Sequence, residues 1–306
     1  MGKNEDKHLE HGFELEGAGE FLAHSAGDWD NFLAARPTFD ARMAAGQDPF
    51  GDLHEIATIL VKNRWPLRLH ATYGETIRHV MEVFEKVKRE QGRFAPRWAI
   101  DHAETVADEE LRRIKAMGGG IAIQNRMAFA GEFFVERYGR EAVRHAPPIR
   151  KMLDMGIPVG AGTDGTRVSS YNPWPSLYWL VTGKTVGGMQ LFAEDNRLTR
   201  EEALRLFTVG SAWFSQEEDV KGSIAPGMYA DFAVLSDDYF SVPEERIKRI
   251  ESLLTVVGGR VVYAAGPFAA LGEGLEPPPL PPVSPAWSPV AHFGGDQSGK
   301  RTATPQ

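Results

Sequence analysis

Four short apolar runs alternate with segments of helical periodicity between residues 50 and 165 of this chain. The helical segments repeat apolar residues at spacings of three and four, as at Leu53, Ile56, Ala57, Leu60 and Val61. The apolar runs that follow them are residues 65–72, 97–102, 119–124 and 157–164. This alternation is typical of βα units, whose strands pair in parallel. The sequence therefore predicts an α/β fold with about four βα units around a parallel sheet.

The chain has 306 residues, enough for a whole (β/α)8 barrel of about 250 residues, but the strand pattern fills only half of one. Helical periodicity continues at residues 176–182 and after a capping box that begins at Thr199. Beyond Ser215 apolar and polar residues alternate, and the Gly258-Gly259 pair predicts a hairpin. We therefore expect a partial barrel in residues 1–215, a β-rich module in 216–271 and a proline-rich tail in 272–306.

Composition excludes several kinds of partner and site. The chain carries 34 basic and 42 acidic side chains, a net charge of −8, which gives no electrostatic reason to expect nucleic acid or an anionic membrane as a partner. It has no cysteine, so a metal ion must be bound by histidine and carboxylate side chains. The first residues lack the apolar core of a signal peptide, and no run of about 18 apolar residues follows. We therefore expect a cytoplasmic protein.

Three residues stand at the carboxyl ends of predicted parallel strands: His70, His102 and Asp164. In an α/β barrel the carboxyl ends of the strands meet at one mouth, where catalytic groups converge. Two imidazoles and a carboxylate are ligands suited to Zn²⁺ or a similar divalent ion that activates water. A single histidine at a strand end is usually a hydrogen-bonded structural residue, but three suitable residues at three strand ends favour a metal site.

Two other patterns resemble known motifs but lack a required part. His54 and Glu55 begin like the H-E-x-x-H motif of zinc proteases, but Thr58 occupies the second histidine position. Gly160 to Gly165 fit G-x-G-x-x-G, but the following residues do not open a helix that would bind a pyrophosphate. Neither a zincin nor a dinucleotide-binding site is expected.

Five runs of the chain resemble the amidohydrolase superfamily, in particular amidohydrolase family 3, the branch of metal-dependent hydrolases similar to N-substituted formamide deformylase. The runs are RLHATYGETI, RWAIDHAETV, GGGIAIQNRM, PVGAGTDGTRVSSYNPW and GSIAPGMYADFAVLS. They lie between about Gly51 and Ala265. The order of His, His and Thr-Asp, followed by the Pro-Gly-x-x-Ala-Asp run, is the most specific part of the resemblance.

The resemblance implies a fold and a ligand set. It makes the chain the C-terminal half of a TIM-type barrel, strands five to eight, with part of a small β-sandwich module. His70 would end the fifth strand and His102 the sixth, both as metal ligands, and Asp164 would end the eighth as a metal ligand and general acid/base. The family's H-x-H motif of strand one does not occur in this chain. The metal site, with one or two divalent ions and zinc as the favoured metal, is therefore expected to be incomplete here.

The function implied is hydrolysis of a non-peptide C–N bond in a small amide-like substrate by a metal-activated water. We expect Gln124, Asn125, Arg167 and Tyr171, in loops at the mouth, to contact the substrate. The alternative is a truncated, catalytically silent remnant or one half of a split enzyme. Unpaired sheet edges would then pair with an N-terminal half-barrel partner or with further copies of the chain in a homo-oligomer.

Overall fold

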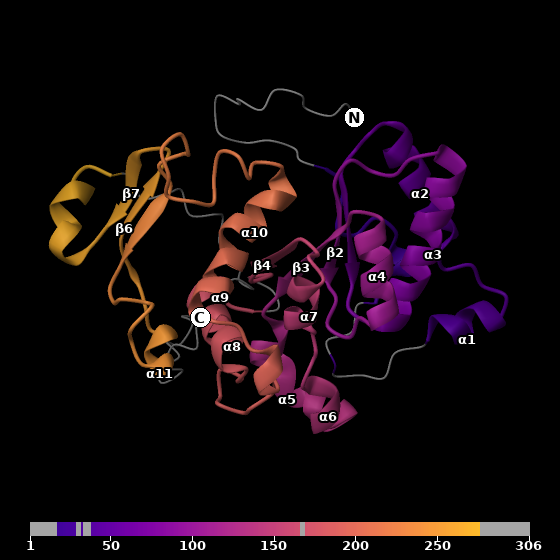
Figure 1. Ribbon diagram of the computed structural model, residues 1–306, viewed down its shortest axis with the longest axis horizontal. Helices are drawn as coiled ribbons and strands as arrows, with labels where there is room; N and C mark the ends of the chain where they lie inside the picture. Colours follow the sequence, from indigo (N-terminus) through magenta and orange to yellow (C-terminus); the bar gives the residue numbers. More distant parts are fainter. Residues whose placement is uncertain (1–16, 29–31, 33–37, 166–168, 276–306) are drawn as a thin grey trace, which may run out of the picture.

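The centre of the protein is a parallel sheet of four strands in the order β1-β2-β3-β4 (Figure 1). The structure is a computed structural model and describes residues 17–28, 32, 38–165 and 169–275. The strands are β1 Leu67–Ala71, β2 Trp98–His102, β3 Gly120–Gln124 and β4 Val159–Gly162. They lie within the four predicted runs, so the expectation of a partial α/β barrel is confirmed. The proline-rich tail predicted from residue 272 lies outside the described residues from 276 onward.

Helices pack along one side of this sheet, where α2, α3 and α4 lie side by side (Figure 1). The helices of this half of the chain are α1 Phe39–Ala44, α2 Gly51–Lys62, α3 Gly74–Gln91, α4 Asp108–Ala116, α5 Arg126–Tyr138, α6 Arg140–Val143 and α7 Ile149–Asp154, with a 3-10 turn η1 at His24–Ala26. The apolar stripe of α3 is fully buried at Ile77, Val80 and Phe84. Burial of such stripes against the strands stabilises each βα unit.

The opposite, inner face of the sheet is poor in side chains at β3 and β4. A Cβ atom on Gly120 would lie 2.5 Å from the ring of Trp213, and one on Gly160 would lie 2.6 Å from the ring of Phe214. These two rings belong to the turn η3, Trp213–Ser215. Glycine is therefore required on the inner face, because aromatic side chains from the C-terminal part of the chain fill this space.

Both outer edges of the sheet have hydrogen-bonding partners in the described part of the chain. Ala18 forms a parallel bridge with Leu67, and its carbonyl accepts from the amide of Arg68 at 2.8 Å. At the other edge, the hydroxyl of Ser211 donates to the carbonyl of Ala161 on β4 at 2.9 Å. Residues 17–20 thus extend the sheet beyond β1, the strand that carries His70.

The C-terminal part contains a second, antiparallel sheet in the order β5-β6-β7. Its strands are β5 Phe232–Leu235, β6 Ser252–Val257 and β7 Arg260–Ala264. Gly258 and Gly259 connect β6 to β7 with φ angles of 57° and 76°, as a two-residue hairpin turn requires. The predicted hairpin is confirmed.

The helices between the two sheets are α8 Pro173–Thr182, η2 Glu194–Asn196, α9 Arg200–Phe207 and α10 Val209–Ala212. Helix α11, Glu244–Ile247, lies between β5 and β6, and η4, Gly266–Gly272, follows β7. The capping box predicted at Thr199 is present. Helix α8 begins before the predicted residue 176 because the side chain of Asn172 accepts a hydrogen bond from the amide of Trp174. Among the helices of the described ranges, none is long and apolar enough to cross a membrane.

Candidate metal centre

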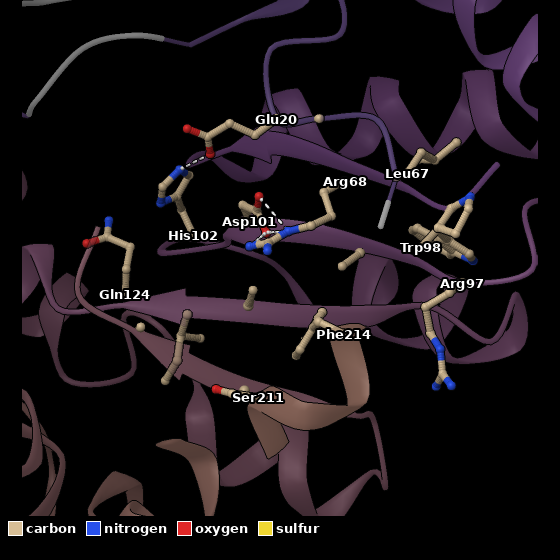
Figure 2. Close-up of a pocket in the computed structure, with 18 of the residues that line it drawn as sticks. Glu20, Leu67, Arg68, Arg97, Trp98, Asp101, His102, Gln124, Ser211 and Phe214 are labelled. Carbon is tan, nitrogen blue, oxygen red and sulfur yellow. Dashed lines mark hydrogen bonds and ion pairs between the residues drawn. The ribbon is translucent and has the colours of Figure 1, made fainter. Parts of the chain in front are cut away.

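Three potential metal ligands converge at the carboxyl ends of β1 and β2: Glu20, His70 and His102. One ligand atom from each lies within 4.8 Å of the other two. The ring centroids of His70 and His102 are 4.2 Å apart. Glu20 reaches His102 from the segment beside β1 (Figure 2). The structure therefore brings the two predicted histidines together, and it adds a carboxylate that the sequence pattern did not indicate.

The spacing of these atoms fits a divalent metal ion. Glu20 Oε2 lies 3.1 Å from His102 Nε2 and 3.6 Å from His70 Nδ1. Two zinc bonds of about 2.0–2.1 Å at a tetrahedral angle separate their donor atoms by roughly 3.4 Å. The second ring nitrogen of His102, Nδ1, is buried without a hydrogen-bond partner among the described residues. The three residues present therefore fit a cation that binds nitrogen and oxygen donors.

Glu20 lies in this position because two glycines allow its segment to approach β1 closely. A Cβ atom on Gly17 would be 2.6 Å from the carbonyl oxygen of Pro66, and one on Gly19 would be 2.6 Å from that of Arg68. A Cβ atom does not come this close to a carbonyl oxygen in real proteins, so only glycine permits the approach to β1 at both positions. The G-A-G-E run is the one sequence signal that could have indicated Glu20.

The electrostatics of the three residues are strongly coupled. Burial lowers the pKa of His70, but hydrogen bonds to Asp28 and Glu20 outweigh it and raise that pKa to about 9. Burial lowers the pKa of His102 to about 4, although Glu20 opposes this shift. Burial raises the pKa of Glu20, but its hydrogen bonds to both histidines dominate and hold that pKa well below its ordinary value. Without a metal ion, the neighbouring carboxylates thus favour the protonated form of His70, whereas burial favours the neutral form of His102.

Asp164 lies apart from the three converging ligands but opens on the same space. A cavity of about 540 Å³ is lined by Glu20, His102 and Asp164 among others. Asp164 follows β4 and has a φ of 50°, and His102 at the end of β2 has a φ of 81°. Left-handed backbone is uncommon for residues other than glycine and concentrates at functional sites. Two of the three residues that the sequence assigned to strand ends, His102 and Asp164, therefore have unusual backbone conformations at the cavity.

A buried polar group links this region to the next strand. Glu104 accepts a hydrogen bond from Gln124 at 2.9 Å, and Arg126 Nε lies 4.0 Å from Glu104. Arg126 Nη2 also lies 4.0 Å from Asp164 Oδ2. Burial raises the pKa of Glu104 to about 7, although Arg126 opposes this shift. The buried guanidinium favours the ionised form of both neighbouring carboxylates.

The residues expected to contact substrate have different positions. Gln124 is the last residue of β3, lines the cavity and is bound to Glu104. Asn125 is fully buried and donates to Ser176 at 2.6 Å, so it packs under the site. Tyr171 is 59% exposed, and Arg167 lies outside the described residues. The prediction that Gln124 lies in a loop is wrong, because it is the last residue of β3, and Asn125 alone forms the turn between β3 and α5.

The chain is similar in sequence and in structure to known proteins. The amidohydrolase family matches residues 4–263. The N-substituted formamide deformylase of Arthrobacter pascens is 27% identical over 215 residues, 69% of this chain and 39% of that protein. An uncharacterised metal-dependent hydrolase from Pyrococcus horikoshii has a similar structure, with a TM-score of 0.54 and 25% identity over 63% of this chain and 38% of the other. The chain thus spans less than two fifths of the length of either relative.

Proposed function

Because this chain belongs to the amidohydrolase family, we propose that it acts in the metal-dependent hydrolysis of a carbon–nitrogen bond, other than a peptide bond, in a small amide-like molecule. One observation supports this function above others: Glu20, His70 and His102 present ligand atoms within 4.8 Å of one another at the carboxyl ends of parallel strands. The names of the formamide deformylase and the metal-dependent hydrolase agree with this class of reaction.

In this function Glu20, His70 and His102 would hold the divalent ion, for which zinc is the favoured metal. A bound divalent ion supplies Lewis acidity, which polarises an amide carbonyl and lowers the pKa of water. The protein's contribution is to keep the two histidines buried and Glu20 close to them, so that a ligand set does not have to form from mobile side chains.

Asp164 would move the proton. Its carboxylate is one-third exposed and faces the cavity, with Arg126 4.0 Å behind it. As a general base it would accept a proton from the water that attacks the carbonyl carbon. It would then donate this proton to the nitrogen as the C–N bond breaks, which gives a carboxylic acid and a neutral amine. The cavity of about 540 Å³ has the size of a site for a small organic substrate.

A second candidate is a site completed by another polypeptide, either an N-terminal half-barrel or a further copy of the chain. Arg68 supports this candidate, because its side chain is 51% exposed on the inner face of the sheet while its partner Asp101 is 5% exposed (Figure 2). Charged residues on the inner face of a barrel are normally covered by other strands. In this case the isolated chain would bind zinc weakly.

Zinc content and amide hydrolysis test the two candidates. We would measure zinc in the dialysed protein by mass spectrometry, and follow hydrolysis of 4-nitroformanilide by the release of 4-nitroaniline. The wild type is expected to retain zinc, and His102→Ala to bind it on the order of 100-fold more weakly with loss of hydrolysis. His145→Ala is the matched control, because it removes an exposed imidazole that is paired with Asp195.

The outcomes separate the candidates. Stoichiometric zinc in a monomeric wild type would exclude the need for a second polypeptide. Zinc that is lost on dialysis and retained only in an oligomer would favour the completed site. Equal zinc affinity of wild type and His102→Ala would show that the assigned ligands are wrong.

A further inference from the structure

A buried carboxylate outside the ligand set connects the candidate metal centre to the adjacent helix. Asp28 has a side chain with no exposed surface, although it lies in a segment without regular structure. An ionised carboxylate in the protein interior is costly unless hydrogen bonds compensate it. The hydrogen bonds of Asp28 therefore indicate the structural role of this segment.

The two oxygens of Asp28 share the amide of Thr72, which lies 3.1 Å from Oδ1 and 3.0 Å from Oδ2, and differ in their other partners. Oδ2 accepts hydrogen bonds from the amides of Thr72 and Tyr73, each at 3.0 Å, and from the hydroxyl of Thr76 at 2.6 Å. These groups form the turn from β1 into α3 and the first turn of that helix. A carboxylate at this end of α3 is also favoured by the helix dipole. One oxygen of Asp28 thus anchors the β1–α3 turn.

The other oxygen faces the candidate metal ligand. Asp28 Oδ1 lies 3.1 Å from His70 Nε2, and the backbone carbonyl of Asp28 lies 3.2 Å from the same nitrogen. The opposite ring nitrogen of His70, Nδ1, faces Glu20. A carboxylate that accepts from one imidazole nitrogen fixes the ring orientation and leaves the other nitrogen to face a metal ion.

We propose that Asp28 is a positioning residue that fixes His70 for metal binding while it anchors the start of α3. This role rests on the proposed function, since it assigns Asp28 to the orientation of a metal ligand. It goes further in one respect: the orientation of His70 is set by the folding of the β1–α3 turn before any ion binds. Glu20 and Asp28, eight residues apart, approach His70 from its two ring nitrogens.

The substitution Asp28→Asn separates the two contacts of this side chain. An asparagine oxygen can still accept from Tyr73 and Thr76, but its amide group cannot accept the Nε2–H of His70. Thr76→Val is the matched control, because it removes the 2.6 Å hydrogen bond at the helix and leaves the His70 contact in place. If Asp28→Asn does not fold, Asp28→Ser provides a second variant. Its side chain is one bond shorter, so it loses the His70 contact together with the turn contacts, and Thr76→Val remains the control for the loss at the turn.

Two measurements are made on each full-length protein. Zinc affinity is measured by competition with a chromogenic chelator, and the Nε2–H signal of His70 is recorded by ¹⁵N-correlated NMR in the metal-free state. We expect Asp28→Asn to bind zinc about 10- to 100-fold more weakly and to exchange the Nε2–H proton faster, since only the backbone carbonyl of Asp28 and the hydroxyl of Thr72 still face this nitrogen. Thr76→Val is expected to have a lower unfolding temperature with unchanged zinc affinity and an unchanged signal.

Each outcome is decisive. Wild-type zinc affinity in a folded Asp28→Asn protein would overturn the role of Asp28, as would equal losses of affinity in Asp28→Asn and Thr76→Val. If the wild type binds no zinc, the proposed function fails, and the NMR signal then judges Asp28 alone. Faster exchange of this proton in Asp28→Asn supports the orienting role, whereas unchanged exchange overturns that role.

Discussion

Arg126 places a guanidinium in the protein interior, next to two carboxylates. Its side chain is 5% exposed and lies 4.0 Å from both Glu104 and Asp164. Its Nη1 donates to the hydroxyl of Thr72 at 3.4 Å, whereas Nε has no hydrogen-bond partner among the described residues. Neither carboxylate makes a short ion pair with it. Arg126 therefore acts mainly as a buried positive charge that offsets the negative charge around the site.

The substitution Arg126→Met tests this compensation. Removing one member of a buried ionic group leaves the other charges unpaired, so we expect the free energy of unfolding to fall by about 3–5 kcal/mol in urea titrations. Addition of Glu104→Gln should recover part of the loss, because it removes the buried carboxylate. Arg144→Met is the control, since Arg144 is exposed and its pair with Glu141 contributes little. Equal effects of the two arginine substitutions would contradict this account of Arg126.

At the level of single residues, the sequence indicated part of the site for a physical reason. His70 and His102 end apolar runs, and the carboxyl ends of parallel strands converge, so their proximity followed from the pattern. Glu20 and Asp28 lie in a segment without an apolar run or a helical period. Their roles depend on the close approach of Gly17 and Gly19 to β1, a tertiary contact that periodicity does not record.

Helices α7 and α9 are connected by a carboxylate with two functions. Glu202 closes the capping box with Thr199 at the start of α9. It also accepts two hydrogen bonds from Arg150 of α7, at 2.7 and 2.8 Å. The hydrogen bonds from Arg150, opposed by partial burial and supported by Thr199, lower the pKa of Glu202 to about 2. The ionised carboxylate thus stabilises both the helix end and its contact with α7.

The stabilisation from Glu202 should depend on pH. Because its pKa is lower in the folded chain than its ordinary value of 4.5, the contribution is complete above that value and is lost as the pH falls toward 2. Glu202→Gln should therefore lower the free energy of unfolding by about 1 kcal/mol at neutral pH, with a difference that shrinks from about pH 5 to about pH 2. Glu201→Gln, on the exposed side of α9, is the control. A pH-independent difference for Glu202→Gln would contradict this assignment.

At the level of elements, strands, caps and turns with a regular sequence pattern could be predicted, whereas a helix with apolar residues on all sides could not. The four strands, the capping box of α9 and the β6–β7 hairpin follow from apolar runs, Thr199 and two glycines. Helix α5 gives no such signal, because it begins directly after β3 and its apolar residues surround the helix. Phe134 is 1% exposed in this helix, whereas Phe133 is 48% exposed. Helical periodicity is therefore absent where both faces carry aromatic residues.

The segment between β5 and β6 attaches the small antiparallel sheet to the rest of the described protein. Tyr239, Ile247 and Ile250 of this segment are at most 2% exposed and belong to the hydrophobic core of the half-barrel. Arg200 of α9 donates to the carbonyls of Tyr239 and Val242, and the hydroxyl of Tyr239 donates to the carbonyl of Arg200. The small antiparallel sheet is therefore attached through a connection that is itself part of the larger core (Figure 1).

Loss of this connection should uncouple the two sheets. Arg200→Ala leaves the carbonyls of Tyr239 and Val242 without their donor, which costs about 1–3 kcal/mol. We expect hydrogen–deuterium exchange to rise in β6 and β7 while β1, β2 and β3 keep their protection, because the larger sheet has its own helices. Arg205→Ala is the control, since this exposed arginine of α9 pairs only with Glu201 in the described part of the chain. If exchange rose equally in both sheets, the protein would instead unfold as one cooperative unit, and the connection would be a contact within that unit and not a junction between two.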